Sequence, residues 1–352
     1  MCSYTDCSEI LHIVEHEKFI PSFIKLVNDK LNFKRHHFFF LKNGKNYVEC
    51  GCEKVTRDSD YRCCLSMLFG LLKYINDAEK IILHGLFSSK LIFLLFLQPW
   101  VLKKCYWMIW GGDLYTYSLD ERNWRWWLKE IFRKIIIKRF GHLVSYLPGD
   151  IELARKWYGA KGKYHECFMY LSNVYKPIDG LNRNSKTINI QVGNSATPSN
   201  EHFEIFERLD KFKKCDVSIY VPLSYGDKKY AELVRKKGES IFGKKLIPMA
   251  DYLPMESYMK FLSQVDIAIF NHRRQQGMGN IISLLSMEKL IYLRPGTSSW
   301  DFLKGLGLYV RDVGKIDLEF PAKEILKNNR KLIEEYFSER RLVDQLRSIF
   351  SH

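Results

Sequence analysis

Residues 270–280 read Phe270-Asn271-His272-Arg273-Arg274-Gln275-Gln276-Gly277-Met278-Gly279-Asn280. They join an apolar run of strand length, 264–270, to a helical spacing of apolar residues that starts at Ile281. In such a loop the free backbone N–H groups and the helix dipole face a ligand, and glycine lets the backbone come close to it. Arg273 and Arg274 add permanent charges that suit a diphosphate. The stretch therefore predicts an anion site, with an exposed basic turn as the alternative, because the spelling is neither the Walker nor the dinucleotide fingerprint.

A second loop of this kind lies earlier in the same half of the chain. It reads Gly193-Asn194-Ser195-Ala196-Thr197-Pro198-Ser199-Asn200, between a predicted strand at 187–192 and a predicted helix at 201–209. Helix capping accounts for some of these side chains, but four polar side chains exceed what a cap needs. Further loops hold Pro222 and Tyr225, after the strand 216–221, and Tyr252, before a helix that ends near 263. Loops at strand ends are where open α/β sheets bind ligands.

Predicted strands and helices also alternate through the first half, which indicates βα units and a parallel sheet. His84-Gly85 follows the predicted strand 80–83 and is a candidate ligand contact; a histidine that only bonds a neighbouring turn is equally consistent. Trp110-Gly111-Gly112-Asp113-Leu114-Tyr115 follows the strand 104–109. Asp113 there suits sugar hydroxyls, and Trp110 or Tyr115 suits a sugar ring face. A plain Gly-Gly-Asp turn with core aromatics is the alternative.

The length of 352 residues fits two domains. The best linker is 176–186, so we place one domain at 1–180 and a second at 187–325, with the last strand at 290–293. Residues 326–352 are charged and helical, and we expect them to pack back on the molecule.

The chain carries 55 basic and 40 acidic residues, a net charge of +15, which indicates a polyanionic partner. Its nine cysteines lack the spacing of a zinc site, and no secretory signal opens the sequence, so we expect reduced thiols in a cytoplasm. The apolar run 91–102 is too short to span a bilayer and predicts a buried helix.

The segment 119–140 has the most unusual composition in the chain. A tryptophan-bearing face beside a basic stripe suits the headgroup zone of an anionic membrane. A surface helix with inward tryptophans is as consistent, and nucleic-acid binding ranks lowest because no recognition motif accompanies the charge. The residues that we assign to the membrane are Trp124, Arg125, Trp127, Lys129, Arg133 and Lys134.

Several of these motifs, in this order, resemble the enterobacterial N-acetylfucosaminyltransferases of the 4-α-L-fucosyltransferase family, glycosyltransferase family 56. The likeness spans most of the chain, and outside the motifs the match is thin. Asn280 and Met287-Glu288-Lys289 depart from the family pattern, which leaves the donor sugar open. The motifs are His84-Gly85 with Phe87, Trp107 with Trp110-Gly111 and Asp113-Leu114-Tyr115, Gly193-Asn194-Ser195 with Ser199-Asn200-Glu201-His202, Val221-Pro222 with Tyr225, and Arg274-Gln275-Gln276-Gly277 with Gly279.

The resemblance implies an α/β enzyme of the GT-B fold, with two Rossmann-like domains whose parallel sheets face a central cleft. It implies retaining transfer, with no metal and no cofactor, of a 4-acetamido-4,6-dideoxyhexose from a dTDP-sugar to an undecaprenyl-diphosphate-linked glycan. Such a reaction belongs to O-antigen or enterobacterial common antigen synthesis. The protein would act as a peripheral protein at the cytoplasmic face of the bacterial inner membrane, bound to its anionic surface, with no nucleic acid as partner. The first domain would bind the acceptor and face the membrane, and the second would bind the nucleotide sugar.

On this interpretation Arg274, with Arg273, stabilises the leaving diphosphate, and His84 and Asp113 approach from the first domain. Asp113 is the candidate base if the reaction inverts. The predicted donor residues are Gly193, Asn194, Ser195, Asn200, Pro222, Tyr225, Tyr252, Arg273, Arg274, Gln275, Gln276, Gly277, Gly279 and Asn280. The predicted acceptor or sugar wall is Gly85, Trp110, Gly111, Gly112, Asp113 and Tyr115.

Two rival functions remain at this point. A non-catalytic, basic scaffold for membranes or polyanions explains the charge but has no need of glycine-flanked loops at strand ends. A phosphotransferase is weaker, because no Walker lysine and no metal-binding carboxylates are evident.

Overall fold

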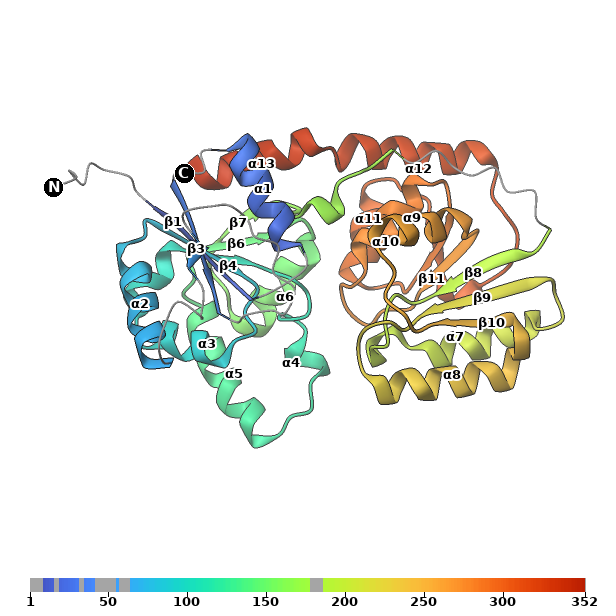
Figure 1. Ribbon diagram of the computed structural model, residues 1–352, viewed down its shortest axis with the longest axis horizontal. Helices are drawn as coiled ribbons and strands as arrows, with labels where there is room; N and C mark the ends of the chain where they lie inside the picture. The colour runs from blue at the N-terminus through green and yellow to red at the C-terminus, as the bar shows by residue number, and fades with distance from the viewer. Residues whose placement is uncertain are drawn as a thin grey trace. The chain divides into compact units, whose positions relative to one another are not determined.

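The computed structural model describes residues 9–15, 19–31, 35–41, 55–56, 64–177 and 186–351 (Figure 1). The chain forms two compact units. Unit 1 comprises Met1–Ser172 and Glu339–His352, and unit 2 comprises Asn173–Ser338. The change of unit falls a few residues before the predicted linker 176–186, of which 178–185 lies outside the described residues.

Unit 1 is built on a seven-stranded parallel sheet in the order β3-β2-β1-β4-β5-β6-β7. This is the doubly wound order, in which the chain starts in the middle, moves to one edge and then crosses to the other. The strands are β1 (Ile10–Val14), β2 (His36–Phe40), β3 (Val55–Thr56), β4 (Lys80–His84), β5 (Cys105–Met108), β6 (His142–Ser145) and β7 (Lys163–Glu166).

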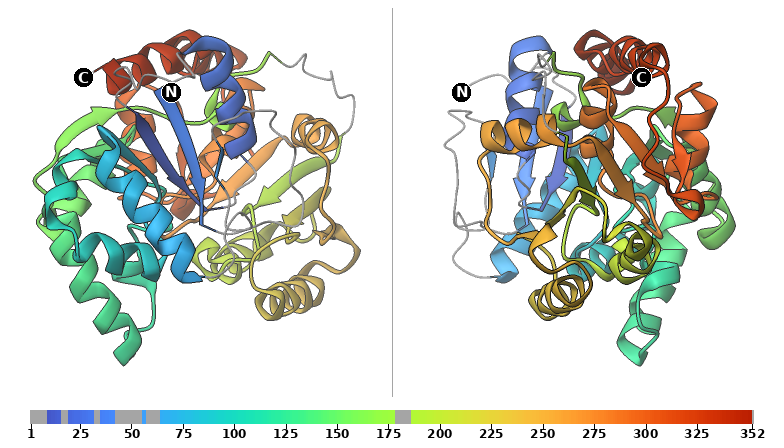
Figure 2. Two further views of the ribbon diagram at one scale, coloured as in Figure 1. Left: turned by 60° about the vertical axis from the view of Figure 1, so that its left-hand side comes forward. Right: turned by 90° about the vertical axis from the view of Figure 1, so that its right-hand side faces the viewer.

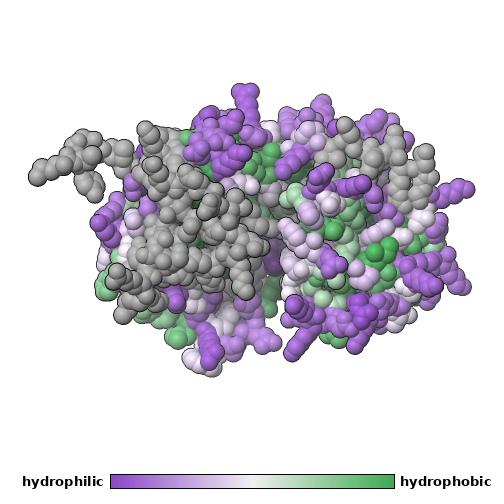
Figure 3. Space-filling model, in the orientation of Figure 1, coloured by the Kyte–Doolittle hydropathy of each residue, from purple (hydrophilic) through white to green (hydrophobic). Residues whose placement is uncertain are grey.

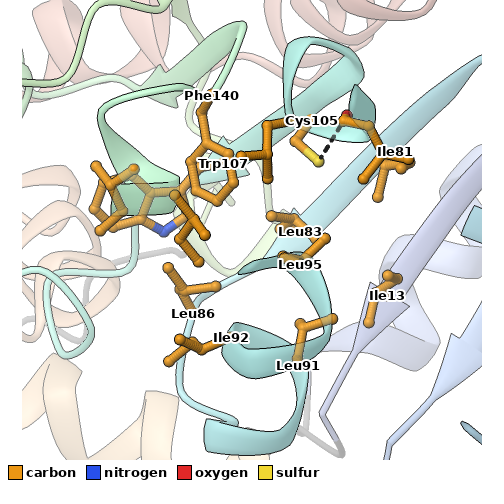
Figure 4. Packing of buried hydrophobic residues seen from close by; sticks show 14 of the residues in the cluster. Ile13, Ile81, Leu83, Leu86, Leu91, Ile92, Leu95, Cys105, Trp107 and Phe140 are labelled. Carbon is orange, nitrogen blue, oxygen red and sulfur yellow. Dashed lines mark hydrogen bonds between the residues drawn. The ribbon is translucent and has the colours of Figure 1, made fainter. Parts of the chain in front are cut away.

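One face of this sheet carries the larger core of unit 1. Ile81 and Leu83 of β4 point into it, and Trp107 of β5 packs there with Phe140 (Figure 4). Alternate residues of a strand face opposite sides, so these positions leave Lys80, Ile82 and His84 on the other face. The helices of unit 1 are α1 (Ile20–Lys30), α2 (Cys64–Asp77), α3 (Ser89–Phe96), α4 (Thr116–Leu119), α5 (Trp124–Ile137), α6 (Pro148–Tyr158) and α13 (Glu339–Ser351), with a 3₁₀ segment at Pro99–Lys104.

The opposite face of the same sheet is closed by the end of the chain. Phe350 of α13 makes edge contacts with His12 and His36, 5.7 and 4.7 Å between ring centroids. Lys80 is buried and donates from Nζ to the carbonyl oxygen of Phe350 at 2.8 Å. Figure 2 shows α1 and the C-terminal helix beside the blue strands β1 and β2.

Unit 2 repeats the doubly wound plan with six parallel strands in the order β10-β9-β8-β11-β12-β13. The strands are β8 (Ile188–Val192), β9 (Val217–Pro222), β10 (Leu246–Met249), β11 (Ile267–Phe270), β12 (Leu290–Leu293) and β13 (Arg311–Asp312). The helices are α7 (His202–Leu209), α8 (Lys228–Phe242), α9 (Met255–Gln264), α10 (Met278–Ser286), α11 (Ser298–Gly305) and α12 (Lys323–Tyr336).

Helices α7 and α8 cover one face of the unit 2 sheet. Phe206 and Phe242 meet there at 5.7 Å between ring centroids, above Ile190 and Ile219 of the strands. The outer side of α8 is hydrophilic, as the purple side chains over it in Figure 3 show. On the other face Tyr220 contacts Phe261 of α9 at 5.4 Å.

Three features differ from the sequence-based predictions. The apolar run 91–102 is not one helix, because Gln98-Pro99 interrupts it and Pro99 begins a 3₁₀ turn. β12 is not the last strand, since β13 adds a short edge strand at Arg311–Asp312. The C-terminal region is two helices, α12 in unit 2 and α13 in unit 1, where one helical segment at 326–352 was expected.

The packing of α13 yields a prediction about stability. Leu346 is fully buried on α13, so Leu346→Ala should lower the free energy of unfolding by about 2–5 kcal/mol through the cavity that it leaves. The control is Arg340→Ala on the exposed side of the same helix, expected within about 0.5 kcal/mol. Chemical denaturation measures both, and equal effects of the two variants would contradict the packing.

Candidate functional site

The predicted anion loops of unit 2 lie at one place in the fold. The strand order of the sheet reverses between β8 and β11, and this switch point is where doubly wound sheets bind ligands, beyond the carboxyl ends of the strands. The loop 193–200 leaves β8 there, and the loop 271–277 leaves β11. The structure therefore brings together two of the loops that the sequence analysis singled out.

The side chain of Gln276 joins these two loops. Its Nε2 donates to Asn194 Oδ1 at 2.9 Å and to Ser195 Oγ at 3.0 Å. Its Oε1 accepts from Ser199 Oγ at 2.8 Å, and the backbone N–H of Arg273 donates to the carbonyl oxygen of Ser199 at 2.9 Å. Both ends of one buried amide are thus used to fix one loop against the other.

Asn200 and His272 form the layer beneath. Asn200 Oδ1 accepts from the backbone N–H of Asn194 at 3.0 Å and lies 3.0 Å from Nε2 of His272. Nδ1 of His272 lies 3.0 Å from the carbonyl oxygen of Gln276, and burial lowers the pKa of this histidine to about 3. A neutral imidazole donates from only one nitrogen, so one of these two acceptors receives no proton from the ring.

Two glycines let the loops adopt this shape. Gly193 has φ +68°, and a Cβ on it would lie 2.7 Å from both Asn200 Oδ1 and His202 Nε2. Gly277 has φ +67° and is the N-cap of α10, where its backbone conformation turns the chain into the helix. Gly279 and Asn280 lie in the first turn of α10, whose free N–H groups open at the switch point.

Arg274 supplies the positive charge of this site. Its guanidinium donates to the carbonyl oxygen of Gln275 at 3.1 Å, and its charge acts on the phenol of Tyr225. Asn194 Nδ2 donates to the Tyr225 hydroxyl at 2.7 Å. Oε1 of Gln275 is buried and has no hydrogen-bond partner within the described ranges. Arg273 differs, since it is exposed and paired with Glu201 at 3.2 Å.

The site contains residues that the sequence analysis missed. Tyr258 of α9 interacts with Gln191 and Asn280, and burial raises its pKa. Behind the loop, Glu204 accepts from Asn271 at 2.8 Å and from Arg294 at 2.6 Å. No sequence signal marks these residues, because each comes from a different helix or strand. Pro222 ends β9 beside the site, whereas Tyr252 is exposed on the loop before α9 and joins none of the hydrogen bonds described here.

Unit 1 has its own switch point between β1 and β4, and His84 ends β4 there. The ring of His84 is buried, with Nε2 3.0 Å from His12 Nδ1 and Nδ1 2.7 Å from the Tyr170 hydroxyl. Burial lowers its pKa to about 3. Both nitrogens are occupied inside the protein, and the catalytic role of His84 stays a prediction. Gly85 follows with φ +82°.

Asp113 is held by a full set of hydrogen bonds inside unit 1. Its carboxylate is fully buried and accepts four hydrogen bonds, from Trp107 Nε1 at 2.7 Å and from the backbone N–H groups of Leu86, Trp110 and Leu114 at 2.9–3.0 Å. Burial raises its pKa, and the Arg133 charge and the bonds from Trp107 and the backbone oppose that rise. Both oxygens are used inside the protein, which is the arrangement of a structural carboxylate, and the role of Asp113 as a base stays a prediction.

The other residues of the predicted acceptor or sugar wall differ in how far they are exposed. Tyr115 is buried and donates to Asp150 at 3.1 Å, so it is a core residue and not a sugar platform. Gly111 and Gly112 form the turn, with the N–H of Gly112 donating to the carbonyl oxygen of Trp110 at 2.8 Å. Trp110 is the residue of the wall that keeps a large half-exposed side chain.

Helix α5 carries the predicted membrane residues, and one of them is buried and cannot contact a membrane surface. Arg133 is fully buried and donates to the carbonyl oxygens of Asp113 at 2.6 Å and Leu86 at 3.1 Å. Lys129 is half-buried and donates to the carbonyl oxygen of Phe87 at 3.0 Å. The side chains that remain exposed are Trp124, Arg125, Trp127 and Lys134.

No helix in the described ranges is long and apolar enough to cross a bilayer. Among the described residues no group of three or more His, Cys, Asp or Glu side chains is arranged to hold a metal ion.

Comparison with protein families decides the identity of this arrangement. A model described as 4-alpha-L-fucosyltransferase, glycosyl transferase group 56, matches residues 13–296, which include both switch points. The chain belongs to this family. The family prediction from the sequence is therefore confirmed, and so is the assignment of the protein as a hexosyltransferase.

Solved structures confirm the predicted fold class. The chain is similar to HepE (Alr3699) of Anabaena in complex with UDP-glucose, with a TM-score of 0.67 and 9% identity over 97% of this chain and 99% of that one. It is also similar to sucrose-phosphate synthase of Thermosynechococcus elongatus, with a TM-score of 0.62 and 10% identity over 97% and 98%. A glycosyltransferase from Rickettsia africae gives a TM-score of 0.62 and 14% identity over 98% and 99%. The chain thus has the GT-B fold.

The four bonds of Asp113 yield a prediction about stability. In Asp113→Asn one oxygen becomes an NH₂ that faces two N–H donors, so we expect a loss of about 2–6 kcal/mol in the free energy of unfolding. The matched control is Asp77→Asn, an exposed aspartate at the end of α2, expected within about 0.5 kcal/mol. Unchanged urea unfolding of Asp113→Asn together with lost transferase activity would return Asp113 to the reaction.

Proposed function

We propose that the protein transfers a 4-acetamido-4,6-dideoxyhexose from a dTDP-sugar to an undecaprenyl-diphosphate-linked glycan, in O-antigen or enterobacterial common antigen synthesis. The reaction takes place at the cytoplasmic face of the bacterial inner membrane. The observation that carries the proposal is the cross-linked pair of loops at the unit 2 switch point, which sets Arg274 beside the N-terminus of α10. Family membership and the similarity to HepE, which was solved with UDP-glucose, support a nucleotide-sugar donor.

The donor diphosphate binds at the first turn of α10. Free N–H groups of that turn and the Arg274 guanidinium face two phosphate charges, which grow as the sugar–phosphate bond breaks. These groups stabilise the leaving diphosphate without a cation or any cofactor. The tyrosines Tyr225 and Tyr252 at the ends of β9 and β10 are the contacts for the nucleoside.

The transfer retains the anomeric configuration, because an α-linked nucleotide donor gives an α-glycoside. In such a reaction the departing phosphate oxygen accepts the proton of the acceptor hydroxyl. No enzymic base is then required, which is consistent with the buried, fully bonded carboxylate of Asp113.

The acceptor is held at an anionic membrane surface by α5 and its neighbour α3. On α5, Trp124, Trp127 and Leu128 are 70%, 53% and 50% exposed. α3 packs against α5 through Phe96 and Phe132, at 4.7 Å between ring centroids. Exposed aromatic side chains beside arginine and lysine match the headgroup zone of a bilayer with anionic lipids. A scaffold without catalysis explains this surface but not the loop network of unit 2.

The donor site yields a prediction about nucleotide binding. Arg274→Ala removes a charged donor from the diphosphate, a loss of about 1.5–3 kcal/mol, so dTDP affinity should fall roughly ten- to hundredfold and turnover should fall with it. Isothermal titration calorimetry with dTDP, beside a transfer assay, measures both. The control is Arg235→Ala, on the exposed side of α8 in the same unit. Wild-type dTDP affinity in Arg274→Ala would remove Arg274 from the site.

The membrane surface yields a second prediction. The variant Trp124→Ser/Trp127→Ser/Leu128→Ser should bind vesicles of phosphatidylglycerol and phosphatidylethanolamine at least tenfold more weakly, because each large apolar side chain contributes roughly 1.5–3 kcal/mol when buried. The control is Leu233→Ser, a half-exposed leucine on the charged helix α8. Vesicle sedimentation that neither the triple variant nor added salt changes would refute this surface.

A further inference from the structure

Five ring side chains form a continuous hydrogen-bonded line in unit 1. Nε2 of His12 lies 2.8 Å from Nδ1 of His36, and Nδ1 of His12 lies 3.0 Å from Nε2 of His84. Nδ1 of His84 lies 2.7 Å from the hydroxyl of Tyr170, which accepts a hydrogen bond from Trp110 Nε1 at 3.0 Å. The three histidines and Tyr170 are buried, and Trp110 is half-buried.

The line is rigid because its members constrain one another. Each contact between two imidazoles needs one N–H and one lone pair, so the tautomer of one neutral histidine sets those of the next. Burial lowers the pKa of His84 to about 3, and burial together with the neighbouring His36 and His84 lowers the pKa of His12. Phe38 stacks on His12 at 4.3 Å, which holds the middle of the line in place.

The backbone before Tyr170 is strained. Met169 has φ +55°, a left-handed conformation that a side chain with a Cβ rarely adopts. The N–H of Met169 donates to Cys167 Sγ at 3.4 Å, and the N–H of Tyr170 donates to the carbonyl oxygen of Phe168 at 2.6 Å. Such strain is found where a side chain must occupy one position. Here the turn follows β7 and places the hydroxyl of Tyr170 beside His84, at the end of β4.

Trp110 is the end of the line that reaches the surface. It lies at the carboxyl end of β5, next to the switch point of unit 1. Its indole contacts the rings of Tyr170, Phe19 and Phe87 at 5.1, 5.4 and 6.2 Å. Phe19 and Phe87 are half-exposed as well, so three partly exposed aromatic side chains lie together. The electron-rich face of an indole attracts the slightly positive C–H groups on one face of a pyranose ring.

We propose that Trp110 stacks on a pyranose ring of the acceptor, and that Tyr170, held by His84, is a positioning residue that fixes the plane of the indole. The identity of the ring as acceptor rests on the proposed function, in which the donor binds in unit 2. The indole N–H is already bonded inward, so the half-exposed ring itself is left to make the contact with the sugar.

The first experiment measures sugar binding by saturation-transfer-difference NMR. The probes are the methyl pyranosides of glucose, galactose and N-acetylglucosamine, with the full-length protein. We expect at least one of them to show saturation concentrated on the protons of one ring face, and Trp110→Ala to abolish it. Tyr170→Phe keeps the ring but loses the hydroxyl, so it should weaken this binding roughly two- to tenfold. The matched control is Tyr164→Phe on β7, whose buried hydroxyl makes no hydrogen bond to the described residues.

The second experiment tests the positioning role without a ligand. In ¹H–¹⁵N spectra the indole N–H signal of Trp110 is the one that disappears in Trp110→Phe. This signal should move upfield in Tyr170→Phe, because the indole N–H loses its hydrogen-bond acceptor. It should stay in place in Tyr164→Phe. Tyr170→Phe with an unshifted signal and unchanged sugar binding overturns the positioning role. The sugar subsite alone is overturned if the wild-type protein binds dTDP but none of the three pyranosides. It is also overturned if Trp110 binds only lipid vesicles. Failure to bind dTDP counts against the proposed function instead.

Discussion

The amide of Gln276 is the interaction on which the candidate donor site depends. It joins the loops that follow β8 and β11, so the ends of two neighbouring strands form one surface. An uncharged amide suits this task, because a carboxylate in the same position would repel an incoming diphosphate. Within the loop, the charged residue that lies nearest to Gln276 along the chain is Arg274. The dipole at the first turn of α10 adds positive potential to that charge. Neutral cross-links thus keep the field of the site positive.

In unit 1 the loops at the strand ends are joined by a charged group instead of a neutral amide. Asp113 ties the loops after β4 and β5 together through four donors, and the charge of the buried Arg133 opposes the rise that burial causes in its pKa. This arrangement uses both carboxylate oxygens of Asp113 inside the protein. The two units therefore share a topology, but the loops at their switch points are held together differently, by a neutral amide in unit 2 and by a carboxylate in unit 1.

Periodicity and loop composition predict much of this molecule. Apolar runs of strand length, each followed by a glycine-containing loop, give the parallel sheets and place His84, Trp110, Gly193 and Gly277 at strand ends. The sequence pattern does not predict which polar side chains are buried. Asp113 and Arg133 look exposed by residue type, yet they are buried because Asp113 is bonded mainly by backbone N–H groups and Arg133 donates to backbone carbonyls and pairs with Glu130. Tyr258, Tyr170 and Glu204 reach their sites through tertiary packing, which leaves no local signal.

The return of the chain to unit 1 has a consequence for biosynthesis. β1 to β7 leave the ribosome first, but one face of their sheet is closed by α13, the last helix to be made. Unit 2 has all of its strands and helices within one continuous stretch and can complete its core earlier. The part of the protein that is translated first is therefore the part that finishes folding last. Until then the nascent chain lacks the cover that Phe350 gives to His12 and His36, which gives a chaperone a defined surface to protect.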